Sequence, residues 1–122
     1  MKKHPLLALL KKACEGLLFS SETDAELNPF VWDAKDGPTP KRLAELSERG
    51  DDPAIEKMTL AAFFRAVPKS EKAKFDALAK QLQEHLSDIE VHKVGEVNLA
   101  VFIVGRTDDG KWAGLQTEVV ET

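Results

Sequence analysis

The chain has 122 residues, 43% of them hydrophobic and 31% charged, a balance typical of one globular domain rather than of a disordered chain. Its 21 acidic residues outnumber 17 basic ones and give a net charge of −4, which argues against a general nucleic-acid-binding protein. Cys14 is the one cysteine, which excludes an internal disulfide and favours a reducing compartment. We therefore expect a single domain over residues 1–122.

The N-terminal residues resemble the start of a signal peptide, with lysines followed by leucines. The apolar run ends at Leu10, however, and Lys11 and Lys12 follow at once, so the run is shorter than a secretory segment. We instead expect a first helix from His4 to Cys14, with Cys14 as a small core residue. No later stretch is long enough to span a membrane, and we expect a soluble, cytoplasmic protein.

Several short elements are expected before residue 69. The segment 17–24 begins apolar and turns abruptly polar, which predicts a surface loop. The other predicted elements are a strand at 30–32, a turn at 36–40, a helix at 40–47 capped by Thr39, a loop at 50–53, a strand at 55–58 and a helix capped by Thr59.

The clearest helix is predicted over 70–86. Ser70 is expected to cap it, and Pro68 blocks its extension upstream. Its apolar positions share one face: Phe75, Leu78, Ala79, Leu82 and Leu86.

After residue 89 the apolar period changes from helical to alternating. The nearly continuous apolar run at 97–104 predicts a central strand buried on both faces. Residues 107–110 predict a hairpin turn in which Gly110 adopts positive φ, followed by a last strand at 111–120. A doubly buried sheet needs helices on both sides, so the sequence predicts an α+β fold, a three-layer α–β–α sandwich with a mostly antiparallel sheet.

No catalytic or metal-binding motif occurs in the sequence. The three histidines, His4, His85 and His92, lack a metal-ligand spacing, and the surroundings of His85 and His92 favour surface or capping roles. Nucleophile-elbow, phosphate-loop and dinucleotide motifs are absent. Nothing in the pattern favours an enzyme, and we expect none.

Acidic residues are concentrated between residues 13 and 36, where Glu22 and Asp24 flank Thr23. Such a cluster is either a solvated face or a surface that offers acceptors to a basic partner. A second feature is the end of the sequence, where only Glu121 and Thr122 follow the last predicted strand. A carboxylate and a threonine hydroxyl are hard oxygen donors suited to Mg²⁺; the alternative is that the domain simply stops there.

The residues ACEGLLFSSE (13–22) resemble the start of the nuclease A inhibitor family of cyanobacteria and other bacteria. The resemblance continues at VGEV (94–97), VFIVG (101–105) and AGLQTEVVET (113–122), and FVW (30–32) and AFF (62–64) also fit. It implies a three-layer α–β–α sandwich that inhibits sugar-non-specific DNA/RNA nucleases of the ββα-metal type.

The resemblance also implies a binding site. Thr122 matches the family threonine that reaches the nuclease's catalytic Mg²⁺, and Glu22 matches a glutamate that pairs with a nuclease arginine. Asp24 and Glu121 are added here as further nuclease-binding residues. We expect no cofactor of the chain's own, no nucleic acid or membrane as partner, and a monomer when free.

The sequence departs from the family before its long helix. An adjacent Asp-Trp pair that the family uses there is missing, since residues 67–70 read VPKS. The alternative is therefore an interaction module of the same fold with a non-nuclease partner, and a second alternative is an enzyme of unrecognised type.

Overall fold

The computed structural model describes residues 5–15, 17–20, 24–32, 38–47, 54–65, 67 and 69–120. Within these ranges the helices are α1 (Pro5–Cys14), α2 (Pro40–Ser47), α3 (Leu60–Phe64) and α4 (Lys69–His85). The strands are β1 (Leu18–Ser20), β2 (Asp24–Glu26), β3 (Asn28–Trp32), β4 (Ile55–Met58), β5 (Ser87–Val94), β6 (Asn98–Arg106) and β7 (Trp112–Val120). Residues 36–37 of the expected turn and the expected loop at 50–53 lie outside the described ranges.

β6 is the central strand of a five-stranded antiparallel sheet with the order β3-β7-β6-β5-β4. Every residue from 99 to 105 is buried, which confirms the predicted doubly buried strand. Val97 precedes β6 and is 50% exposed, so the strand begins one residue later than its apolar run. The β6–β7 turn contains Gly110 at φ 80°, as predicted, because glycine adopts positive φ without steric cost.

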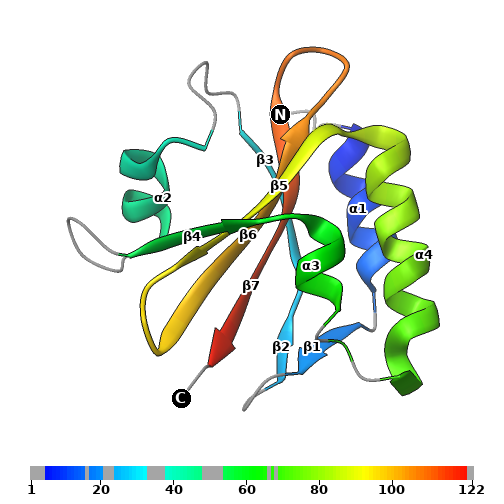
Figure 1. Ribbon diagram of the computed structural model, residues 1–122. Helices are drawn as coiled ribbons and strands as arrows, with labels where there is room; N and C mark the ends of the chain where they lie inside the picture. The colour runs from blue at the N-terminus through cyan, green and yellow to red at the C-terminus, as the bar shows by residue number, and fades with distance from the viewer. Residues whose placement is uncertain are drawn as a thin grey trace.

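Two apolar clusters attach helices to the two faces of this sheet. The larger cluster joins α1, α3 and α4 to one face through residues that include Leu10, Phe63, Leu78 and Ile103. The smaller cluster joins α2 to the other face through Leu43, Val94, Ala100 and Phe102. Figure 1 shows α2 on one side of the sheet and α1 and α4 on the other. The fold is thus α+β and has the three layers that the sequence predicted.

Both predicted threonine caps are present. Thr39 Oγ1 accepts a hydrogen bond of 3.2 Å from the Arg42 N–H at the start of α2, and Thr59 Oγ1 accepts one of 3.1 Å from the Ala62 N–H at the start of α3. Each cap satisfies a backbone donor that has no partner within its helix. None of the described helices is long and apolar enough to cross a membrane.

α4 buries the predicted apolar face, with Phe75, Leu78 and Leu82 buried on the helix and Leu86 buried just beyond it. The predicted cap is wrong, because α4 begins at Lys69 and Ser70 lies inside its first turn. Helix ends inferred from pattern carry this uncertainty of a residue or two.

β3 extends the predicted strand by two residues and includes Pro29. Proline is compatible with this position because β3 is an edge strand, where its missing N–H can face away from the ladder. Phe30 and Trp32 stack with ring centroids 4.5 Å apart and both pack against Phe102, in the cluster that holds α2.

The prediction of a loop at 17–24 is wrong for residues 18–20 and for Asp24, which belong to strands. Residues 18–20 form β1 and pair antiparallel with β2, so that Leu18 lies opposite Glu26 and Ser20 opposite Asp24. The sequence signal was weak because each strand has three residues and β2 reads Asp-Ala-Glu, residue types depleted in strands. β2 forms despite the low strand propensity of its residues, because it pairs with β1 and contacts β7.

Candidate functional site

The β1–β2 hairpin lies at the same end of the molecule as the end of β7. Only Leu27 separates β2 from β3, and β3 runs antiparallel to β7 with Asn28 opposite Gln116. Followed backward from Asn28, the chain therefore passes along β7 toward Val120, and both β1 and β2 contact β7. Figure 1 shows the two hairpin strands beside the lower half of β7. The register thus directs the tip of the hairpin toward the end of the last strand.

Of the four predicted binding residues, only Asp24 lies within the described ranges. Asp24 is the first residue of β2. Glu22, Glu121 and Thr122 lie outside the described residues, so their positions stay predictions. The structure does place their neighbours: Ser20 and Asp24 flank residues 21–23, and Val120 precedes Glu121.

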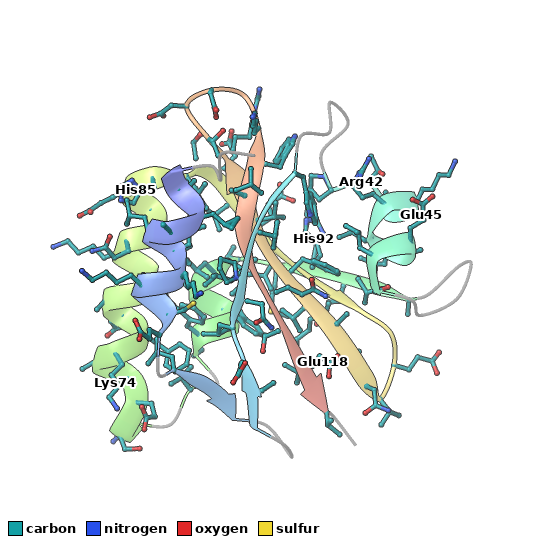
Figure 2. All side chains as sticks on the ribbon, turned by 180° about the vertical axis from the view of Figure 1, so that it is seen from behind. Arg42, Glu45, Lys74, His85, His92 and Glu118 are labelled. Carbon is teal, nitrogen blue, oxygen red and sulfur yellow. The ribbon has the colours of Figure 1, made fainter. Side chains whose placement is uncertain are left out.

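Two glutamates outside the predicted binding set also lie at this end. Glu26 on β2 and Glu118 on β7 are exposed, and Glu118 is visible near the end of its strand in Figure 2. Glu26 belongs to the acidic region at 13–36 that the sequence showed, whereas the position of Glu118 follows from the pairing of the strands.

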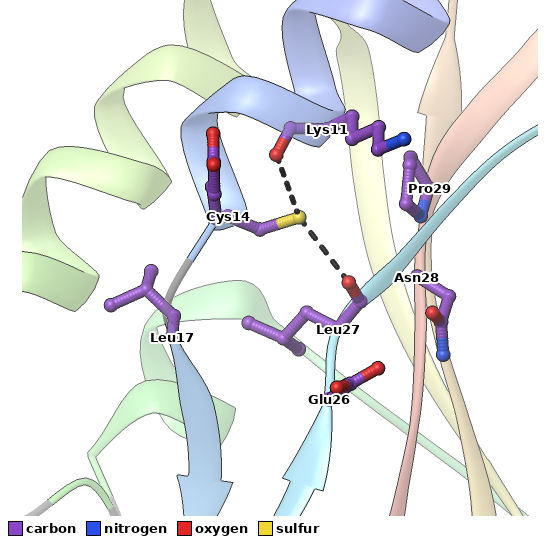
Figure 3. Close-up of a pocket in the computed structure, with 8 residues that line it drawn as sticks. Lys11, Cys14, Leu17, Glu26, Leu27, Asn28 and Pro29 are labelled. Carbon is purple, nitrogen blue, oxygen red and sulfur yellow. Dashed lines mark hydrogen bonds between the residues drawn. The ribbon is translucent and has the colours of Figure 1, made fainter.

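A groove of about 480 Å³ lies between the C-terminal end of α1 and the β2–β3 segment (Figure 3). Its lining residues are Lys11, Cys14, Glu15, Leu17, Glu26, Leu27, Asn28 and Pro29. The Cys14 thiol donates to the Leu27 carbonyl oxygen at 3.3 Å and to the Lys11 carbonyl oxygen at 3.6 Å, which ties the helix to the strand segment.

Cys14 is a structural residue, as predicted. Its side chain is 5% exposed and belongs to the larger apolar cluster. Burial raises the pKa of the thiol, its backbone hydrogen bond opposes this, and the negative charge of Glu15 raises the pKa further. Since the thiolate is the nucleophilic form, this environment disfavours cysteine chemistry.

The sequence predicts a surface or capping role for His92, and this prediction is wrong. The residue is 6% exposed and lies on the face of the sheet that α2 covers (Figure 2). Its Nε2 atom is 3.4 Å from Glu90 Oε2 but makes no hydrogen bond within the described part of the chain. Burial lowers the pKa of the imidazole, Glu90 opposes that shift, and Lys57 adds to it.

His92 predicts a pH-dependent stability. Because its pKa is lowered in the folded state from 6.5, the unfolded chain binds more protons as the pH falls below 6.5. The free energy of unfolding should therefore decrease between pH 7.5 and 5.5, as measured by urea titration. His92→Gln should flatten this decrease, whereas the matched His85→Gln variant should keep it. An unchanged slope in His92→Gln would contradict the assignment.

No group of three or more His, Cys, Asp or Glu side chains that could hold a metal ion occurs among the described residues.

A family model described as nuclease A inhibitor-like protein matches residues 4–122, nearly the whole chain. The chain belongs to this family. Membership implies a role as a nuclease inhibitor and a protein partner such as a nuclease. No curated protein sequence matches the nuclease A inhibitor-like chain.

Proposed function

We propose that this nuclease A inhibitor-like protein inhibits a metal-dependent, sugar-non-specific nuclease of the ββα-metal type by occupying its active-site cleft. The observation that carries the proposal is the common location of the β1–β2 hairpin and the end of β7. These two segments lead directly into the predicted binding residues, so one end of the molecule can enter one cleft.

The electrostatic logic is competition with nucleic acid. A nuclease cleft must attract phosphates, so it carries cationic side chains and a divalent metal. The carboxylate of Glu22 would accept hydrogen bonds from an arginine that otherwise holds the scissile phosphate. Asp24 and Glu121 would increase the association rate by long-range attraction, an effect that weakens with salt.

Thr122 would direct its oxygen atoms to the Mg²⁺ ion of the nuclease, in the position of a water or phosphate oxygen. Such hard donors suit this ion, which belongs to the partner and is present in the complex only. Val120, the last residue of β7, lies two positions before Thr122 in the chain, which supports a short segment there rather than a long free tail. An anchored segment loses less backbone entropy on docking than a free tail, at about 1–2 kcal/mol per residue ordered.

The decisive experiment titrates a purified ββα-metal nuclease with the purified chain and follows cleavage of DNA and of RNA. We expect loss of both activities near equimolar protein, with inhibition relieved by excess substrate. Full activity at a large excess of the chain contradicts the proposal. Binding without inhibition supports the alternative, an interaction module whose contacts lie outside the cleft.

A further inference from the structure

The groove between α1 and the β2–β3 segment combines an apolar floor with a charged rim (Figure 3). Cys14, Leu17, Leu27 and Pro29 supply the apolar surface. The rim includes two exposed carboxylates, Glu15 and Glu26, together with the exposed side chains of Lys11 and Asn28. This arrangement suits a ligand with an aliphatic body and a polar head.

The two rim carboxylates are available to a partner. Among the described residues, no ion pair involves Glu15 or Glu26. Both line the groove, Glu15 from just after α1 and Glu26 from the end of β2. The rim therefore carries two carboxylates against the single ammonium group of Lys11, an excess of negative charge that favours a cationic ligand.

The groove adjoins the hairpin at the proposed nuclease-binding end. Leu17 immediately precedes β1, and Glu26 is the last residue of β2 and lies opposite Leu18. A partner that covers the tip of the hairpin can thus reach the groove at its base. Enzymes that bind polyanions carry basic side chains around their clefts, and these are the complementary groups for this rim.

We infer that the groove binds one arginine or lysine side chain from the edge of the nuclease cleft, an inference that rests on the proposed function. The aliphatic part of such a side chain would lie on Leu17, Leu27 and Pro29, as long basic side chains do on apolar surface. Its cationic head would pair with Glu26 on the strand side of the groove, and Glu15 on the α1 side would add attraction at longer range. The positive charge of Lys11 repels this cation and should weaken its binding.

The test measures the Kd of the full chain for the inhibited nuclease at low salt. Glu15→Gln and Glu26→Gln should each raise Kd about twofold to fivefold, as expected for exposed ion pairs. Glu26→Lys should raise it by about tenfold or more because it replaces attraction with repulsion. Lys11→Gln should lower Kd by about twofold. These changes should shrink as salt is added.

Glu84→Gln provides the matched control, because Glu84 is exposed near the end of α4, away from the groove. It removes the same charge and should leave Kd unchanged, and thermal unfolding should show that all variants are folded. Glu15 and Glu26 variants that behave like Glu84→Gln overturn the inference. If instead only Leu17→Ser weakens binding, the occupant is apolar and the inference is also wrong.

Failure of the two proposals can be told apart. If the wild-type chain inhibits the nuclease and the groove variants are silent, only the groove inference falls. If the wild-type chain neither binds nor inhibits ββα-metal nucleases, the proposed function falls, and the groove inference falls with it.

Discussion

Gly114→Ala is expected to destabilise the fold by about 3 kcal/mol, the upper end of the range typical for overpacking a buried site. Gly114 lies on β7 opposite Val104 of the central strand. An added Cβ would overlap the carbonyl oxygen of Ile103 and lie 2.8 Å from its carbonyl carbon. Because these are backbone atoms in the buried part of β6, no side-chain rotation can relieve the overlap. The two strands would have to move apart at the centre of the sheet.

Gly110→Ala is the matched comparison for this prediction. Gly110 has φ 80° and nothing within 4 Å of its built Cβ, so alanine there costs only backbone strain, about 1–2 kcal/mol. Urea unfolding of both variants, with retained far-ultraviolet circular dichroism as the test of folding, separates the two mechanisms. If Gly114→Ala were no more destabilising than Gly110→Ala, close packing of β6 and β7 would not be the reason for a glycine at 114.

The features that the sequence predicted well are those specified by many local residues at once. α4 repeats its apolar positions over 17 residues, and β6 is apolar along most of its length. The caps at Thr39 and Thr59 depend on a single hydroxyl that bonds three residues ahead, so local sequence suffices to find them.

The features that the sequence missed depend on distant neighbours. β1 and β2 exist because they pair with each other and contact β7, which no local pattern reveals. His92 is one of the polar residues that alternate with the apolar Ile89 and Val91, as in a half-exposed strand, yet its face is the one that α2 covers. Which face a short helix covers is a tertiary outcome and cannot be read from the period of the strand.

The candidate site likewise combines features that the sequence shows with features that only the fold shows. The acidic segment around Glu22 and the terminal Glu121 and Thr122 are visible in the sequence as composition and resemblance. The location of the β1–β2 hairpin beside β7, by contrast, follows from the β3–β7 register and from the contacts of the hairpin with β7. The groove depends on still more of the fold, because Glu15 follows α1, Glu26 ends β2, and the two residues line one groove only in the folded chain.

Glu22→Ala is expected to raise the Kd for the inhibited nuclease by about two orders of magnitude. Removing one partner of a buried charged pair typically costs about 2–5 kcal/mol, and about 2.7 kcal/mol corresponds to a hundredfold change. Most of the loss should appear as faster dissociation, because a close pair affects residence time more than encounter. Competition titration with a cleavable oligonucleotide, combined with stopped-flow dissociation, measures both quantities.

A double-mutant cycle with Thr122→Ala then tests whether the two segments act in one cleft. If Glu22 meets an arginine and Thr122 meets the metal of the same nuclease, each single variant weakens inhibition while the chain stays folded. Two contacts that do not touch each other should add within about 0.5 kcal/mol, so the double variant should lose nearly the sum. Asp24→Asn, which removes a neighbouring charge, should mainly slow association and lose its effect in salt. If Glu22→Ala inhibits as strongly as the wild type, the proposed arginine contact is wrong. If Thr122→Ala inhibits as strongly as the wild type, the hydroxyl of Thr122 does not contribute to metal binding.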